Sequence, residues 1–305
     1  MSLDQYESVQ RWLDRLRAKS AGRKTSTVRV FSHYLRMFCS RIAHKRPDEL
    51  IAERRFHLKS DDELVRRKHE ELVTKFILEL QEQGASSNTV STAVGAVRSF
   101  YNANYVPLVG LVVPRGIPVR SFRIPNRTEL KTVCEAADPL TRTWILCQKD
   151  CGISIADLLR LSLDTPSPVY GTVKQQLREG RVPVHLHIVR EKTATAYDTF
   201  LGEDAVEALN EWQPSSSHIF PVIDKTVRNH LRRTSKTAKL GYRLLPHSIR
   251  KYFNTYMKLS GMNESLIEYL MGHSLGEVRG AYFVPPVEEL AKVYMEHYHA
   301  ISVPW

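Results

Sequence analysis

The stretch LPHSIR at 245–250 carries the most informative spacing in the 305-residue chain. Pro246 is typical of the first turn of a helix. His247 and Arg250 stand three residues apart, so a helix that begins here places an imidazole and a guanidinium on one face. We therefore predict a helix over 246–260. Near its start it carries His247 and Arg250, and Arg250 is always cationic.

Two polar elements follow this helix in the sequence. The segment MGHS at 271–274 ends a short amphipathic helix that we predict over 263–271. Tyr282 lies nine residues beyond His273. An imidazole–guanidinium pair, a second imidazole and a phenol thus follow one another in one part of the chain.

A β-hairpin is predicted upstream of these elements. Residues 182–189 (VPVHLHIV) alternate and contain β-branched side chains, which favours a strand. Residues 195–201 can pair back to it, so that Lys192 falls in the connecting loop. His185 and His187 point to one face of the first strand, but no third ligand is evident, and we expect no metal site.

The first part of the chain predicts a helical bundle. Apolar residues recur at helical spacing over 27–43, over 61–83 and again from Ser86 onward, and Asp61–Asp62 supply capping chemistry for the second helix. The apolar stripe of that second helix comprises Leu64, Leu72, Phe76 and Leu80. The bundle is expected to have basic outer faces.

The prolines and arginines after residue 106 predict an extended basic linker between two domains. We expect a helical domain at 1–113, the linker at 114–126 and a mixed domain at 127–305. Further helices are predicted at 127–137, 141–150, 154–163, 203–212, 224–240 and 287–298. In the last of these, Leu290, Val293, Tyr294 and Tyr298 share one face, which either packs onto a neighbouring protomer or onto its own domain.

The charge balance points to a polyanionic partner. Lys and Arg number 44 against 33 Asp and Glu, a net charge of +11. The four cysteines show no zinc spacing, and buried free thiols are expected. No signal peptide and no apolar run of membrane-spanning length is recognised, so a cytoplasmic, nucleoid-associated protein without membrane contact is expected.

Taken together, these motifs resemble the tyrosine recombinase family, which includes the phage integrases and Xer-like proteins. The family's boxes match HSIR at 247–250, YLMGHS at 269–274 and AYF at 281–283, and SSNTVSTAVGAVRSFY at 86–101 looks like the end of its core-binding domain. The resemblance implies a helical, SAM-like core-binding domain. It also implies a mainly α catalytic domain with a small antiparallel sheet.

The resemblance also implies a chemistry and a set of roles. Tyr282 would attack a DNA phosphorus and form a 3′-phosphotyrosine, while Arg250 would hold two phosphate oxygens. His247 would accept or return the tyrosine proton, or bond a phosphate oxygen. His273 would donate to a nonbridging oxygen, and Lys192 would protonate the leaving 5′ oxygen. No metal, nucleotide or other cofactor is expected.

The sequence departs from the family at one position. The family's first catalytic arginine stands in a Gly-x-Arg-x-x-Glu-Leu box, which matches 152–158 here, with Ser154 in place of the arginine and Asp157 at the acidic position. Losing a fixed cation costs about 10²–10³ in rate. Another cation such as Arg160 or Lys149 replaces it, or the enzyme is slow or needs a partner. The remaining alternative is a catalytically dead relative, or an altered version of an active one.

The leading hypothesis is a site-specific DNA recombinase or integrase that clamps double-stranded DNA and pairs into a dimer or tetramer on it. The alternatives are a catalytically impaired DNA-binding relative with an architectural or regulatory role, and a nicking–closing enzyme of the topoisomerase IB type. The basic residues expected to contact DNA are Arg29, Arg36, Arg98, Arg115, Arg120, Arg123, Arg228, Arg232, Arg233 and Lys236.

Overall fold

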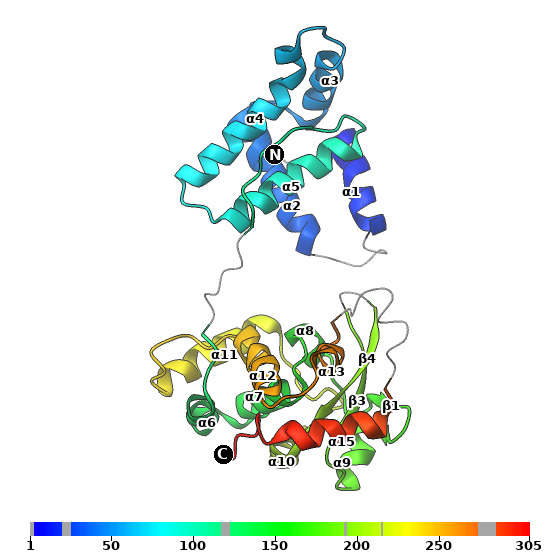
Figure 1. Cartoon of the computed structure of the whole chain (residues 1–305), viewed down its shortest axis with the longest axis vertical. Coiled ribbons are helices and arrows are strands. Elements are labelled where there is room, and N and C mark those ends of the chain that lie inside the picture. The colour runs from blue at the N-terminus through cyan, green and yellow to red at the C-terminus, as the bar shows by residue number, and fades with distance from the viewer. Residues whose placement is uncertain (1–2, 20–25, 117–122, 192–193, 215, 274–284) are drawn as a thin grey trace. The chain divides into compact units, whose positions relative to one another are not determined.

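The computed structural model describes residues 3–19, 26–116, 123–191, 194–214, 216–273 and 285–305. By its internal contacts the chain divides into two compact units, Met1–Val119 and Arg120–Trp305 (Figure 1). Helices dominate the described residues, and their strands form two small antiparallel sheets. The predicted fold class, mainly α with a small antiparallel sheet, is confirmed.

Helices packed around one apolar core make up the first unit. They are α1 (Glu7–Lys19), α2 (Ser26–Met37), the π-helix η1 (Phe38–Ala43), α3 (Pro47–His57), α4 (Glu63–Glu82) and α5 (Ser87–Ala103). The cap positions of two helices agree with the sequence pattern. Asp62 accepts a hydrogen bond from the Leu64 amide at 2.8 Å, and Ser86 accepts one from the Thr89 amide at 3.2 Å.

The first unit also differs from the sequence expectation in several places. The helix predicted over 27–43 is α-helical only as far as Met37 and continues as the π-helix η1, and α1 and α3 were not predicted. Leu64 was placed on the apolar face of α4, but 73% of its surface is exposed. That assignment was wrong because the buried face of α4 begins only at His69.

The second unit is built around α7 (Pro139–Cys151), which contacts α6, α8, α10, α11, α12 and β4. Its other helices are α6 (Arg127–Ala136), α8 (Ile155–Leu158), α9 (Val173–Arg178), α10 (Glu203–Trp212), α11 (Asp224–Thr237), α12 (Pro246–Leu259), α13 (Glu264–Leu270) and α15 (Val287–Tyr298). Among the described residues, no helix is both long enough and apolar enough to cross a lipid bilayer.

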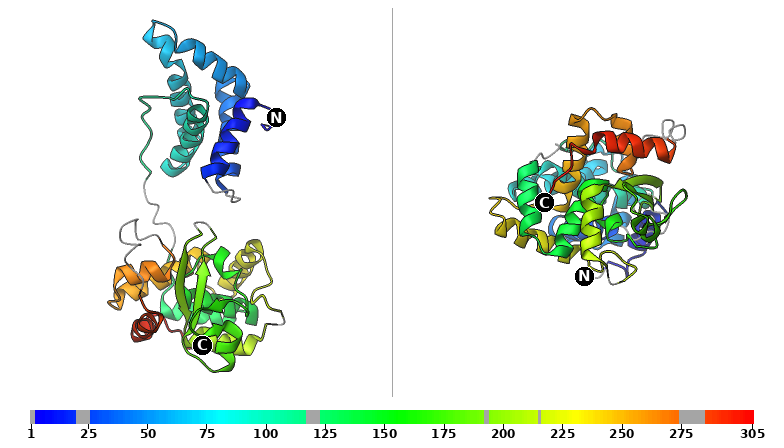
Figure 2. Two further views of the ribbon diagram at one scale, coloured as in Figure 1. Left: turned by 90° about the vertical axis from the view of Figure 1, so that its right-hand side faces the viewer. Right: turned by 90° about the horizontal axis from the view of Figure 1, so that it is seen from below.

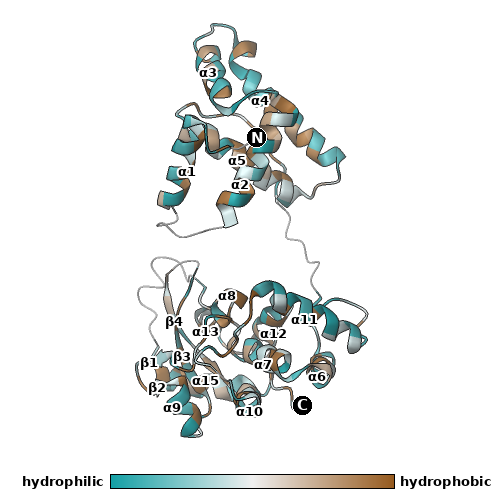
Figure 3. Ribbon diagram, turned by 180° about the vertical axis from the view of Figure 1, so that it is seen from behind, coloured by the Kyte–Doolittle hydropathy of each residue, from teal (hydrophilic) through white to brown (hydrophobic). Residues whose placement is uncertain are grey.

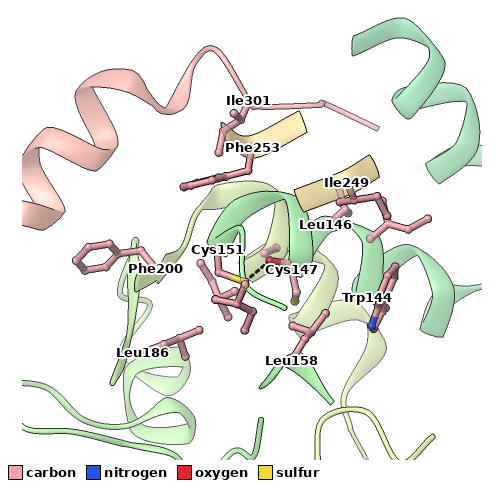
Figure 4. Close-up of a cluster of buried hydrophobic side chains, with 14 of the residues drawn as sticks. Trp144, Leu146, Cys147, Cys151, Leu158, Leu186, Phe200, Ile249, Phe253 and Ile301 are labelled. Atoms are coloured by element: carbon pink, nitrogen blue, oxygen red, sulfur yellow. Dashed lines mark hydrogen bonds between the residues drawn. The ribbon is translucent and has the colours of Figure 1, made fainter. Parts of the chain in front are cut away.

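The core of this unit forms where α7 meets α12 and the strands. Figure 4 shows Cys147 and Cys151 at its centre, with Phe253 from α12 and Phe200 from β4 around them. All four cysteines are buried free thiols, as predicted. Burial raises the pKa of Cys151 to about 12, so this thiol is unreactive at neutral pH.

The predicted hairpin is present as β3 (Val184–Val189) and β4 (Ala196–Leu201), which pair antiparallel with Val184 opposite Leu201. A second, smaller pair, β1 (Pro166–Ser167) and β2 (Gly171–Thr172), was not predicted, and neither was α9. The helix predicted over 154–163 is too long. It ends at Leu158 because the chain turns there to form a bridge between Ser162 and His218.

The C-terminal helix α15 packs on its own unit. Leu290, Tyr294 and Tyr298 are at most 3% exposed, so this face is not available to a neighbouring protomer. Figure 2 shows α15, in red, on the outside of the unit. Of the two placements that the sequence left open for this helix, the structure has the intramolecular one.

A buried ionic cluster fastens this helix. The Lys149 ammonium lies 2.6 Å from Asp204 and also contacts Asp150, and all three side chains are buried. Tyr298 from α15 joins the cluster by accepting a hydrogen bond from the Asp204 amide at 2.9 Å. The α7, α10 and α15 helices therefore meet at one internal set of charges.

Replacing Lys149 with Met should destabilise this unit by about 3–5 kcal/mol, because two buried carboxylates lose their counter-charge. Urea unfolding followed by tryptophan fluorescence measures the change. Lys174→Met, at an exposed lysine of α9, is the matched control and should shift stability by less than about 0.5 kcal/mol. Equal effects of the two substitutions would contradict the structural role of the cluster.

Candidate active site

The guanidinium of Arg250 is the centre of the site. Arg250 lies in the second turn of α12, which starts at Pro246 as predicted, and its side chain is buried at 7% exposure. Its Nη1 donates to the Gly152 carbonyl at 2.7 Å, and its Nη2 donates to the Met271 carbonyl at 3.0 Å. One side chain thereby joins the end of α7, the start of α12 and the end of α13.

Two glycines at this site adopt backbone conformations that other residues rarely reach. Gly152 ends α7 with φ +59°, and an added Cβ would lie 2.3 Å from the Phe253 ring. Gly272 has φ +65°, and its Cβ would lie 2.7 Å from the Tyr197 ring. Both turns therefore require glycine, and so do the carbonyl positions that these turns present to the site.

His273 lies against Arg250 in the structure. Arg250 Nη2 donates to His273 Nε2 at 2.5 Å. Because a guanidinium carries only donors, Nε2 must accept, and the ring proton stands on Nδ1, which contacts the Glu268 carboxylate. Donation from Nε2 to a phosphate oxygen would require an additional proton and release of Arg250.

The ionisation of both site histidines is shifted in the same direction. Burial lowers the pKa of His247 and of His273. The neighbouring charge of Arg250 lowers both further, whereas Glu268 acts in the opposite sense on His273. His247, in the first turn of α12, is consequently neutral at pH 7 and has a lone pair with which to accept a proton.

The Ser154 position holds no charge. Ser154 caps α8: its hydroxyl donates to the Asp157 carboxylate at 2.7 Å and accepts from the Asp157 amide at 3.2 Å. The Asp157 side chain also accepts from the Glu191 amide at 2.9 Å. The only hydroxyl proton of Ser154 is therefore committed to Asp157.

The two replacement cations suggested by the sequence occupy different surroundings. Lys149 is excluded, because its ammonium is completely buried against Asp150 and Asp204. Arg160 has a 54% exposed side chain, and its carboxylate neighbour is Asp157 at 4.0 Å. Neither residue forms a hydrogen bond to Arg250 or His273 in the part of the chain that the structure describes.

Sequence reasoning missed Arg190, which follows β3. Its Nη1 donates to the Gly272 carbonyl at 2.5 Å, next to the Met271 carbonyl that holds Arg250. Burial lowers the pKa of Arg250, and the charge of Arg190 lowers it further. Its place two residues before Lys192 in the predicted loop was the only available signal.

Three of the predicted site residues lie outside the described residues: Lys192, Tyr282 and Arg120. The hairpin that carries Lys192 is present on both sides of it, and α15 begins at Val287, after Tyr282.

His185 and His187 take part in a network of hydrogen bonds and are not free ligands. Asp198 lies 3.0 Å from His185 Nε2 and 2.8 Å from His187 Nδ1, and it accepts from the Tyr269 hydroxyl at 2.6 Å. Within the described ranges no group of three or more His, Cys, Asp or Glu side chains is arranged to hold a metal. The network links the hairpin to α13.

Basic side chains gather on α11 and the turn after it. Arg232, Lys236, Lys239, Tyr242 and Arg243 line an open groove. Arg233 is also exposed, whereas Arg228 pairs with Asp224 at 2.8 Å. Figure 3 shows that α11 is largely hydrophilic. This surface carries four of the predicted DNA contacts.

The remaining predicted contacts lie outside α11. Arg123 stacks over the Tyr242 ring, 4.6 Å from its centroid, and pairs with Glu129 at 2.6 Å, so it stands at the edge of the same groove. The predicted contacts that the structure describes in the first unit are all exposed: Arg29, Arg36, Arg98 and Arg115. Arg98 lines a groove there together with Arg15.

Comparison with known proteins places this site in a family. The Phage integrase family matches residues 129–283, a range that includes Ser154, Arg190, His247, Arg250 and His273. Tyrosine recombinase XerC of Pseudomonas fluorescens is 25% identical over 72% of this chain and 76% of its own length. Tyrosine recombinase XerC of Bacillus pumilus is 26% identical over 73% of this chain and 79% of its own length. The chain therefore belongs to the phage integrase family of tyrosine recombinases.

Solved structures agree with this assignment in fold. A lambda integrase(75–356) dimer bound to a COC′ core site has a TM-score of 0.62, with 14% identity, 92% of this chain covered and 98% of that chain. A lambda integrase tetramer bound to a Holliday junction has a TM-score of 0.58, with 13% identity and coverage of 91% and 77%. The architecture of this chain is thus that of the lambda integrase type.

We expect His273 to titrate below pH 6.5, because burial and Arg250 both favour its neutral form. The Glu268→Gln variant should titrate lower still, since it removes the charge that favours the imidazolium. NMR of ring-labelled histidine measures both midpoints and identifies the nitrogen that carries the proton. A midpoint at or above 6.5, or a proton on Nε2 at pH 7, would contradict the hydrogen bonds described here.

Proposed function

We propose that this protein is a site-specific DNA recombinase that cleaves and rejoins DNA through a 3′-phosphotyrosine at Tyr282. The observation that carries the proposal is the buried Arg250 guanidinium, which is held by neutral carbonyls beside His273 and whose charge also acts on His247. Neutral acceptors orient the guanidinium without cancelling its charge. A phosphodiester oxygen supplies the missing negative charge.

The reaction exchanges one phosphorus–oxygen bond for another. The Tyr282 oxygen attacks phosphorus, the bond from phosphorus to the 5′ oxygen breaks, and the phosphate stays on the 3′ end of the cut strand, now joined to the tyrosine. The phenolic proton leaves to a base, and the departing 5′ oxygen takes up a proton. Attack of a 5′ hydroxyl from another strand reverses these steps and rejoins DNA.

The site residues divide this work by their charge and protonation. Arg250 stabilises the negative charge that builds up on the nonbridging oxygens. His247, neutral at pH 7 because its pKa is lowered, accepts the phenolic proton. Lys192 protonates the leaving oxygen, as the family resemblance implies. His273 exchanges its bond with Arg250 for one with a phosphate oxygen.

In this proposal the two units contact different parts of the DNA. The first unit, with Arg29, Arg36 and Arg98, is the core-binding domain, the linker tracks the backbone, and the second unit is the catalytic domain. The α11 groove supplies further phosphate contacts. The lambda integrase structures, a dimer on a core site and a tetramer on a Holliday junction, support assembly of protomers on DNA.

Cleavage should produce a covalent adduct with a pool of randomised duplexes, each carrying one nick that lets the short 5′-hydroxyl fragment diffuse away. The adduct should retain a label at the 5′ end of the cut strand. After nuclease and trypsin treatment, mass spectrometry should find the nucleotide on peptide 280–292, in which Tyr282 is the only tyrosine. Sequencing of the trapped DNA identifies the preferred site.

Tyr282→Phe should abolish the adduct, while Tyr256→Phe, a partly buried tyrosine of α12, should leave it unchanged. Rejoining between two duplexes, rather than relaxation of supercoils alone, separates recombination from topoisomerase action. Duplex binding without any adduct across the whole pool would identify a DNA-binding relative instead and would contradict the proposal.

Affinity for a 40-base-pair duplex should fall steeply with salt, because bound cations release counterions from the phosphates. Arg232→Gln combined with Lys236→Gln should reduce the slope of log K against log salt by about two. Lys174→Gln in α9, at the opposite end of the second unit from α11 (Figure 1), is the control. An unchanged slope in the double variant, or an equal change in the control, would argue against the groove as a phosphate contact.

A further inference from the structure

The proposed function leaves one position of the site unfilled. A phosphodiester that becomes pentacoordinate gains charge on both nonbridging oxygens, and one guanidinium offers at most one planar fork. Ser154 stands where the resemblance leads one to expect a second arginine, and its hydroxyl proton is committed to Asp157. A second cation must therefore come from elsewhere in the fold if cleavage is efficient.

Arg190 lies beside Arg250 although the two are far apart in the sequence. Arg250 donates to the carbonyl of Met271 at 3.0 Å, and Arg190 donates to the carbonyl of Gly272 at 2.5 Å. Consecutive carbonyls of one turn thus hold the two guanidinium groups. The positive φ of Gly272, where a Cβ would overlap the Tyr197 ring, fixes this turn.

The hairpin is also anchored at the Ser154 position. Asp157 accepts from the Ser154 hydroxyl at 2.7 Å and from the amide of Glu191, the residue after Arg190, at 2.9 Å. One buried carboxylate therefore connects the start of α8 to the end of β3. Arg190 enters the site from the strand that is tied to the very position where the arginine is missing.

The surroundings of Arg190 leave its charge available. Its side chain is partly exposed, and no ion pair joins it to a carboxylate among the residues that the structure describes. Asp157, the acid that faces this region, is bonded to neutral donors and contacts Arg160 only at 4.0 Å. Two neighbouring guanidinium groups that are both held by carbonyls repel each other, and an anion between them relieves that repulsion.

We propose that Arg190 is the second phosphate-binding cation of this site and replaces the arginine absent at Ser154. It donates to a nonbridging oxygen of the scissile phosphate while Arg250 holds the other, and it neither forms nor breaks a covalent bond. This assignment rests on the proposed function for its role in cleavage. The anion site formed by Arg190 and Arg250 stands on the geometry alone.

Arg190→Gln should lower the rate of adduct formation on the trapped duplex by about 10²–10³ and change duplex affinity by less than about threefold. Arg160→Gln, the rival cation in the same neighbourhood, should leave the rate within about threefold. The double variant Ser154→Arg, Arg190→Gln should form the adduct at least about tenfold faster than Arg190→Gln alone. The opposite pattern, with Arg160→Gln impaired and Arg190→Gln normal, would overturn the assignment.

A methylphosphonate at the scissile position separates a phosphate contact from a merely structural role. It replaces one charged nonbridging oxygen with a methyl group, so less positive charge is needed. The defect of Arg190→Gln should shrink to about tenfold or less on this substrate. A defect that stays at its full size would mean that Arg190 only supports the fold of the hairpin.

Titration with inorganic phosphate tests the anion site without cleavage. In NMR of arginine side-chain Nε groups, Arg190 and Arg250 should shift together with one midpoint, and Arg190→Gln should remove the shift of Arg250. If no duplex gives an adduct but this coupling is present, the proposed function fails and the anion site stands. If phosphate moves Arg250 equally in Arg190→Gln, the inference fails whatever the cleavage result.

Discussion

The buried guanidinium of Arg250 is the constraint on which the rest of the site depends. Burial of a charge is costly unless hydrogen bonds replace those to water. Arg250 makes them to the carbonyls of Gly152 and Met271 and to His273. These partners fix the end of α7, the start of α12 and the end of α13 with respect to one another. Because they are neutral, they satisfy the donors and leave the positive charge free to act on a phosphate.

The same unit holds a buried set of ion pairs in a different place. Lys149, Asp150 and Asp204 neutralise one another in the interior, where they fasten α15, the helix that follows Tyr282 in the sequence. Arg250 and Arg190, by contrast, have no carboxylate bonded to them among the described residues. The fold thus separates charges that stabilise the structure from charges that await a ligand, as expected where an anion must be bound and released.

The sequence predicted those parts of the molecule whose signal is local. The helices at 203–212 and 287–298, the caps at Asp62 and Ser86, and the His247–Arg250 pair follow from spacing within one or two turns. Arg190 was missed because its importance arises from a contact with Gly272, 82 residues away. Lys149 was misjudged for the same reason: its spacing says nothing about Asp204, which buries and neutralises it.

The most direct test of the account is a crystal structure of the Tyr282→Phe variant bound to a duplex that carries its preferred site. The account predicts one phosphate whose nonbridging oxygens lie about 3 Å from the guanidinium nitrogens of Arg250 and Arg190, with the residue 282 ring facing its phosphorus. A complex in which DNA is bound but no phosphate reaches Arg250 would contradict it.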